Sequence, residues 1–255
     1  MKTFAYALAA ATALPLMACA TPANPTPVSD EVSIVPTEHT VHSYILLDRT
    51  GSMSNIWDEA LGSVNAYADS VGKVEDGEAD DLDTAVTLAV FDYQESLQFD
   101  VLRKDVEPDA WAPVTSDEAS PRGMTPLFDA IGHMVALAEK DAPEKAVIVI
   151  MTDGMENSSR EITKDGANAA LDRARARGWE VVFLGAEFAN FDDAEAVGVT
   201  SDRTMAVGAG QLSQSMETLA RKSRDYGKGE EAEIIFDEAD RAEAGEEDVK
   251  QRNGR

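Results

Sequence analysis

The sequence predicts an α/β fold: a doubly wound, mostly parallel sheet flanked by helices on both faces, with one antiparallel edge strand. Two observations predict it. Apolar runs of strand length alternate along the chain with segments whose apolar residues recur every three or four positions, as in amphipathic helices. The run 146–151 (AVIVIM) contains no polar residue, and such a strand is typical of a parallel sheet that is covered on both faces.

Five segments are expected to be strands because they are short, apolar and rich in β-branched residues. In chain order they are 44–47, 84–91, 97–102, 146–151 and 181–184. The first ends abruptly at Asp48. The second and third are separated only by a short polar turn, which indicates that they pair with each other.

Four segments are expected to be helices. They are 56–71, 127–138, 163–177 and 211–226. In the first, apolar residues from Ile56 to Val71 recur at spacings of three and four and form one face. The second follows Thr125-Pro126, since proline is favoured at an early helical position.

Oxygen-bearing side chains follow two of these strands and precede one helix. The stretch 48–54 (DRTGSMS) follows the first strand, 123–126 (GMTP) leads into the second helix, and 152–154 (TDG) follows the strand 146–151. Ligands bind an open α/β sheet at the carboxyl ends of its strands. Two carboxylates and three hydroxyls form an all-oxygen set that suits a hard cation such as Mg²⁺. Gly51 is expected to allow the tight turn in the first stretch.

These three motifs, in this order, resemble the metal site of the von Willebrand factor A (VWA) domain family, and especially its stand-alone bacterial members. The resemblance rests on D-x-[ST]-G-S-M, G-x-T-P-L and T-D-G and covers about residues 42–226. In that family the site is the metal-ion-dependent adhesion site (MIDAS). The resemblance implies Mg²⁺, or alternatively Mn²⁺ or Ca²⁺, held by Asp48, Thr50, Ser52, Thr125 and Asp153.

The roles implied by the resemblance differ among these residues. Thr50 and Ser52 would bind the cation directly, Thr125 would add a ligand from the second loop, and the two aspartates would hold the ion directly or through water. Thr50 stands where the family usually has serine, and the donor chemistry is the same. The sequence leaves open whether Met53, next to this loop, belongs to the core or to a binding face.

A cation held largely by neutral hydroxyls keeps its affinity for one further anionic oxygen. A protein partner can supply that oxygen from an aspartate or glutamate, so the expected function is a non-enzymatic, cation-dependent adhesion or scaffold module. The alternative is a metal-dependent hydrolase that uses the same cation. Glu156 is the only nearby carboxylate that could act as its acid or base, and an exposed loop position is the simpler interpretation; His133 lies in a predicted helix. A structural protein with an idle site is a third possibility.

Charge and cysteine content exclude several other classes of function. The 255 residues carry a formal net charge of −26 at pH 7, and the sequence pI is about 4.3. Nucleic acids and anionic lipid surfaces are bound by clustered Lys and Arg, so neither is an expected partner of the folded domain. One cysteine and three histidines argue against a disulfide framework and against a Cys- or His-rich metal centre. The oligomeric state stays open.

The N-terminus has the pattern of an export signal. Residues 1–18 contain Lys2, a short apolar run and small residues at the expected cleavage site. Leu16-Met17-Ala18-Cys19 resembles the lipobox of bacterial lipoproteins, whose cysteine is lipidated, and ordinary cleavage after Ala20 is the alternative. We therefore expect a lipid anchor at Cys19 and a place in the bacterial envelope. By resemblance to the sorting of Gram-negative lipoproteins, Ala20 after the cysteine implies the outer membrane, facing the periplasm. Without lipidation the protein would be periplasmic or secreted.

The remaining boundaries follow from composition. Residues 19–41 are proline-rich and predict an extended tether, residues 42–226 form the domain, and residues 227–255 form an acidic segment. Within that segment, the apolar run 234–236 is expected to pack on the domain as a short edge strand. The chain from Ala244 is expected to be loose.

Overall fold

The structure is a computed structural model that describes residues 40–73, 82–188 and 190–253. The predicted signal peptide, the lipid attachment at Cys19 and residues 19–39 of the tether lie outside the described residues. None of the helices in the described ranges is both long and apolar enough to cross a bilayer.

In the described residues, a six-stranded sheet forms the centre of the domain, in the order β3-β2-β1-β4-β5-β6. Its strands are β1 (Val41–Asp48), β2 (Thr84–Gln94), β3 (Ser96–Val106), β4 (Ala146–Thr152), β5 (Glu180–Ala186) and β6 (Thr204–Val207). Only the edge strand β3 pairs antiparallel within this sheet, and the other neighbours are parallel. The predicted fold class is confirmed.

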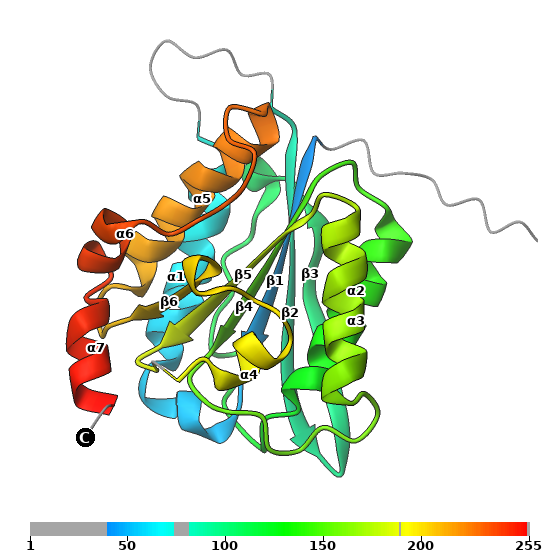
Figure 1. The fold of residues 1–255 in the computed structure, drawn as a ribbon, viewed down its shortest axis with the longest axis vertical. Coiled ribbons are helices and arrows are strands. Elements are labelled where there is room, and N and C mark those ends of the chain that lie inside the picture. The colour runs from blue at the N-terminus through cyan, green and yellow to red at the C-terminus, as the bar shows by residue number, and fades with distance from the viewer. Residues whose placement is uncertain (1–39, 74–81, 189, 254–255) are drawn as a thin grey trace, which may run out of the picture. The chain divides into compact units, whose positions relative to one another are not determined.

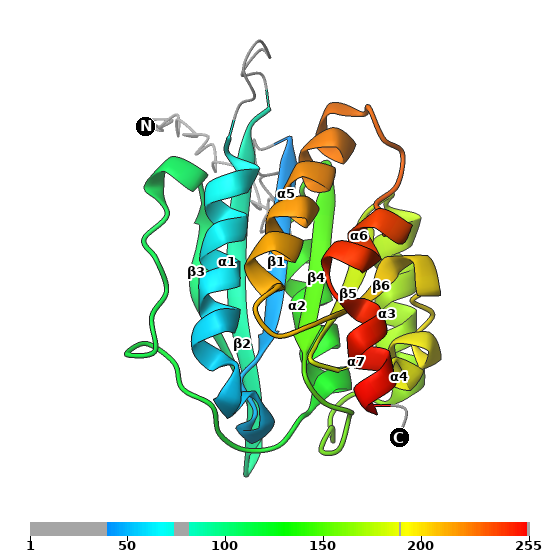
Figure 2. The ribbon, with the colours of Figure 1, turned by 90° about the vertical axis from the view of Figure 1, so that its left-hand side faces the viewer.

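Helices cover both faces of the sheet, as Figure 1 and Figure 2 show. One face carries α1 (Trp57–Val71) and α5 (Leu212–Lys228), and the other carries α2 (Leu127–Asp141) and α3 (Lys164–Ala176). The shorter elements are α4 (Asp192–Ala196), α6 (Glu238–Glu243), α7 (Glu246–Asn253), η1 (Gly51–Asn55), η2 (Pro108–Ala110) and η3 (Ser201–Arg203).

The two faces of the sheet explain why its central strands are apolar throughout. Successive side chains of a strand point to opposite faces. In β1, Ile45 and Leu47 pack with α1 and α5, whereas Tyr44 and Leu46 pack with α2 and α3. β4 lies between β1 and β5, and its Val149 is fully buried, so the run that predicted the parallel sheet is indeed at its centre.

The short elements β6 and α4 are among those that were not predicted from the sequence. β6 has four residues and α4 has five, so neither is long enough for apolar periodicity to stand out. β6 is an edge strand that pairs only with β5 within the sheet.

The C-terminal segment differs from the prediction. Ile234 and Phe236 are buried and Ile235 is exposed, so two of these three residues pack on the domain as expected, but the run is not a strand. The expectation that the chain from Ala244 is loose is wrong, because α7 packs against β6 and buries Val249 completely.

Candidate metal centre

The parallel pairing of β1 with β4 brings two of the predicted motifs together. Their register runs from His42 opposite Ala146 to Leu47 opposite Met151, so Asp48 and Thr152 end neighbouring strands at the same edge of the sheet. After β1 the chain turns at once into η1, where the Met53 N–H donates to the Thr50 carbonyl over 3.1 Å.

The second loop reaches the same place because it is pinned to two neighbours. The Gly51 N–H donates to the Gly123 carbonyl over 3.3 Å, and Met124 forms an antiparallel bridge with Tyr93. Gly123 has a φ of +72°, and a Cβ there would lie 2.4 Å from the Tyr93 carbonyl oxygen. Gly51 has no positive φ, and its Cβ would make only an ordinary 3.6 Å contact. The glycine that this geometry requires is therefore Gly123, and the expectation placed on Gly51 is wrong.

The predicted side chains lie in one hydrogen-bonded cluster. The Ser52 hydroxyl donates to Asp153 Oδ1 over 2.6 Å, and Thr50 Oγ1 lies 3.1 Å from Ser52 Oγ. The Thr125 hydroxyl donates to Thr50 Oγ1 over 3.4 Å. Asp48 is linked to the same cluster, because its Oδ1 accepts the Thr50 N–H over 2.7 Å. Three chain segments thus present oxygen atoms to one another.

Asp48 is a fully buried carboxylate whose hydrogen-bond donors are neutral. Its Oδ2 accepts the Thr152 hydroxyl over 2.6 Å. Burial raises the pKa of Asp48 to about 7, the nearby Asp153 charge adds to the rise, and the hydrogen bonds from Thr152 and Thr50 oppose it. Burial also raises the pKa of the half-buried Asp153. Among the described residues, no Lys, Arg or His forms an ion pair with either aspartate.

A divalent cation fits this set of donors. Two carboxylates without a positive partner would have their charge balanced by it, and the three hydroxyls are neutral oxygen donors. In the part of the chain that the structure describes, no group of three or more His, Cys, Asp or Glu side chains is placed to hold a metal ion. A centre built from nitrogen or sulfur ligands is therefore not what these residues offer, whereas a hard oxygen-preferring cation is.

The three stretches that carry the predicted ligands, 48–54, 123–126 and the loop that begins at Thr152, are called the metal loops below. A buried ion-pair network holds the first two of them in place, and sequence reasoning missed it. Asp92, at the end of β2, is fully buried, and it accepts Arg49 Nε over 2.6 Å and Arg122 Nε over 3.2 Å. The Arg122 N–H also donates to the Arg49 carbonyl over 2.8 Å. The available signal was that Asp92 is a charged residue directly after the apolar run 84–91, but its partner Arg49 is 43 positions away in the sequence.

The third loop is fixed by Asn157 and Glu156. Asn157 Oδ1 accepts the Thr125 N–H over 2.9 Å, and the Asn157 N–H donates to the Thr125 carbonyl over 3.0 Å. The Glu156 carboxylate accepts the N–H groups of Ser158, Ser159 and Phe128, so it organises the loop and the first turn of α2. An exposed position was the simpler interpretation of the sequence, but Glu156 is half-buried.

Two other residues that were singled out from the sequence lie away from the cluster. Met53 is fully buried in the core with α1 and α5, which settles its role as a core residue. The His133 side chain is 43% exposed on α2 and lies 3.2 Å from Glu161.

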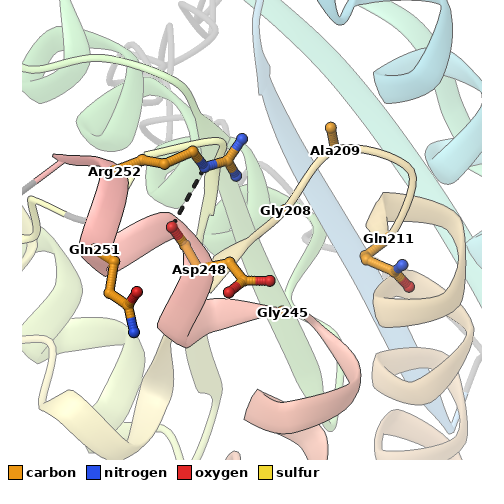
Figure 3. A pocket seen from close by; sticks show the side chains of 7 residues that line it. All are labelled: Gly208, Ala209, Gln211, Gly245, Asp248, Gln251 and Arg252. Carbon is orange, nitrogen blue, oxygen red and sulfur yellow. Dashed lines mark hydrogen bonds between the residues drawn. The ribbon is translucent and has the colours of Figure 1, made fainter.

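A cavity of about 480 Å³ lies elsewhere, between the turn after β6 and α7. Figure 3 shows Asp248, Gln251 and Arg252 of α7 on one side of it and Gln211, which precedes α5, on the other. Arg252 pairs with Glu187 over 3.1 Å, and its Nε donates to the Asp248 carbonyl. This cavity contains none of the predicted metal ligands.

Comparison with known proteins supports the fold. No protein-family model and no curated protein matches the sequence. The von Willebrand factor domain of the type V pilus tip protein Mfa5 from Porphyromonas gingivalis covers 73% of this chain and 95% of its own, with a TM-score of 0.55 and 10% identity. The pilus adhesin SpaC from Lactobacillus rhamnosus GG covers 74% of this chain, with a TM-score of 0.52 and 14% identity.

A third similar structure is proximal thread matrix protein 1 from the mussel byssus, in a form whose MIDAS motif is occupied by zinc. It covers 74% of this chain, with a TM-score of 0.50 and 13% identity. The present chain spans about half the length of the mussel protein and 30% of SpaC. At these identities the similarity concerns the fold alone. The chain has the von Willebrand factor A fold, as shown by the strand order of its described residues, their antiparallel edge strand and these structural neighbours.

Proposed function

We propose that this chain is a non-enzymatic protein-binding module that depends on a divalent cation held by Asp48, Thr50, Ser52, Thr125 and Asp153. One observation carries the proposal: two aspartates without an ion-pair partner among the described residues lie in one cluster with three hydroxyls, and the five side chains come from three segments. A single divalent cation would balance both charges. Mg²⁺ is the proposed ion, and Mn²⁺ or Ca²⁺ would use the same donors.

The bound cation would supply a site for one oxygen of a carboxylate on the protein partner. The chain's own residues would fix the position of the cation, because the ion pairs of Asp92 and the hydrogen bonds of Asn157 hold the loops and Asp48 is fully buried. Ser52 is exposed to solvent, so a partner's aspartate or glutamate can reach the cluster from outside.

Hydrolysis by the same centre is the alternative, and the position of Glu156 disfavours it. A hydrolase needs an acid or base that is free to exchange a proton with substrate or water. The Glu156 carboxylate already accepts three backbone N–H groups within its own loop and at the start of α2. Its removal is therefore expected to loosen the loop.

The proposed function is tested by cation-dependent capture of partners. The purified domain is immobilised and exposed to an extract of cell-envelope proteins in millimolar Mg²⁺ and then in EDTA. We expect EDTA to elute partner proteins from the immobilised wild type and none from Asp48→Ala. Glu246→Gln changes a carboxylate on α7 and is the control variant, so EDTA should elute the same proteins from it as from the wild type. Equal retention by the wild type in Mg²⁺ and in EDTA would refute the cation-dependent function.

We further propose that Cys19 is lipidated and tethers the domain to the bacterial envelope, most consistently with the outer membrane facing the periplasm. The lipobox-like sequence before Cys19 supports this, and two proteins of the same fold are a pilus tip protein and a pilus adhesin. Cys19→Ser should release the protein from the membrane fraction or leave the precursor uncleaved. A variant with wild-type fractionation and the same mature mass would contradict the anchor.

A further inference from the structure

Two exposed methionines flank the proposed metal ligands. Across the described ranges, four large hydrophobic side chains are exposed: Val101 at 40%, Met124 at 47%, Met155 at 45% and Ile235 at 45%. Met124 directly precedes Thr125, and Met155 follows Asp153 by two positions. Two of these four exposed side chains therefore belong to the metal loops.

The exposure of both methionines is built into the backbone. Met124 exchanges two hydrogen bonds with Tyr93, of 3.0 and 3.3 Å, so its main chain is held in a β-bridge. Just after Met155, the Glu156 N–H donates to Asp193 over 2.7 Å. Asn157 then ties this loop to Thr125 through two hydrogen bonds. The two methionine-bearing loops are thus fixed to each other and leave both side chains about half exposed, with Met155 Sδ accepting a weak hydrogen bond from Asn190 Nδ2 over 3.5 Å.

We infer that Met124 and Met155 form an apolar rim that selects a partner whose metal-binding carboxylate is flanked by apolar side chains. The inference rests on the proposed function and adds the chemistry of the partner. Methionine is unbranched and polarisable, so it adapts to apolar groups of different shape. Apolar contact on either side of a carboxylate would also exclude water from its contact with the cation, which strengthens that contact.

The charge of the chain supports the same partner chemistry. With a net charge of −26, the chain repels an extended acidic surface on a partner. A single carboxylate set among apolar residues avoids that repulsion and still provides the oxygen that the cation requires. One isolated Asp or Glu with apolar neighbours is therefore favoured over a run of acidic residues as the partner segment.

Three capped pentapeptides test the inference: Gly-Leu-Glu-Leu-Gly, Gly-Gly-Glu-Gly-Gly and Gly-Leu-Gln-Leu-Gly. Their binding is followed through the backbone amide NMR shifts of Ser52 and Gly154, with the protein in Mg²⁺ and in EDTA. In Mg²⁺ the leucine-flanked glutamate should bind about tenfold more tightly than the glycine-flanked one, the effect of burying roughly two methylene groups. The glutamine peptide should not bind, and EDTA should abolish binding of the other two.

Substitutions at the rim identify the source of the preference. Met124→Gln combined with Met155→Gln should reduce it to less than twofold and leave the affinity for the glycine-flanked peptide unchanged. The double leucine variant should keep the preference. Ile235→Gln is the matched control, because Ile235 is as exposed as Met155. Its neighbour Phe236 donates its N–H to the Asp202 carbonyl near the start of β6, so Ile235 lies away from the metal loops.

Three results would overturn the inference, and they separate it from the proposed function. If both glutamate peptides bind the wild type equally in Mg²⁺ and are released by EDTA, the cation site stands and the rim has no selective role. If the double glutamine variant keeps the tenfold preference, another surface provides it. If neither glutamate peptide distinguishes Mg²⁺ from EDTA, the proposed function fails and the inference fails with it.

Discussion

Asp48 in the metal loops and Glu246 on α7 are both buried carboxylates, 0% and 4% exposed, but their surroundings differ. Glu246 accepts hydrogen bonds from Lys250, from the Ala206 N–H and from Arg241, and although burial raises its pKa, these contacts outweigh burial and lower it. Asp48 is hydrogen-bonded by Thr152 and Thr50, which are both uncharged, and burial raises its pKa to about 7.

The difference indicates what each carboxylate is for. Glu246 has its positive partners within the chain and closes the edge of the sheet by binding the Ala206 N–H of β6. Asp48 has no such partner in the described residues, so a cation from solution is the group that would stabilise its charged form. The predictions below test this contrast between internally paired and unpaired carboxylates.

The largest effect is expected at Asp92, the fully buried aspartate between Arg49 and Arg122. Asp92→Ala leaves the 4% exposed Arg49 with only the half-exposed Asp100 as an acidic partner, and breaking a buried ion pair typically costs about 3–5 kcal/mol, so we expect a loss toward the lower end of that range. Urea unfolding measures the loss of unfolding free energy. A loss below about 1 kcal/mol, the scale of surface ion pairs, would show that the network does not hold the loops.

A smaller effect is expected from pH in the absence of metal. Because the pKa of Asp48 is about 7 when folded and ordinary when unfolded, the folded state binds more protons between these values. Stability in EDTA should therefore fall as pH rises from 5.5 to 8, by about 2 kcal/mol. Asp48→Asn should lack this part of the fall, and Mg²⁺ should reduce it in the wild type by stabilising the carboxylate. An identical pH dependence of wild type and Asp48→Asn would contradict the assignment.

Glu246→Gln tests the paired carboxylate directly. Removing its charge weakens the contacts with Arg241 and Lys250, and we expect a loss of about 1–2 kcal/mol because both basic side chains are partly exposed. The pKa of Glu246 is lowered in the folded state. The contribution of its carboxylate to the free energy of unfolding should therefore be lost as the pH falls below the pKa of an ordinary glutamate. Equal stability of variant and wild type at pH 7 would mean that α7 is held by apolar contacts alone.

The same contrast explains what could be predicted from the sequence. The metal loops were accessible because neighbouring parallel strands end at one edge, so Asp48 and Asp153 could be placed together without coordinates. The Arg49–Asp92 pair was not accessible, because no local pattern links a residue after β1 to one at the end of β2.

The C-terminal segment could not be predicted for a related reason. α7 has little apolar periodicity, and of its eight residues only Val249 is apolar. The segment is ordered by distant contacts, from Glu246 to β6 and from the Gly208 N–H to the Ala244 carbonyl. The capping box of α6, in which Asp237 accepts the Asp240 N–H, was a local signal that the sequence did carry.

The most direct measurement is thermal unfolding of wild type, Asp48→Ala and Glu246→Gln, each in EDTA and in millimolar Mg²⁺. At a free Mg²⁺ concentration tenfold above the dissociation constant, binding should stabilise the wild type by about 1.4 kcal/mol. Glu246→Gln should start from a lower melting temperature and gain the same increment. Asp48→Ala should remain folded in EDTA and gain nothing. A wild type that melts identically in EDTA and in Mg²⁺, Mn²⁺ or Ca²⁺ would contradict the metal site and the binding function that depends on it.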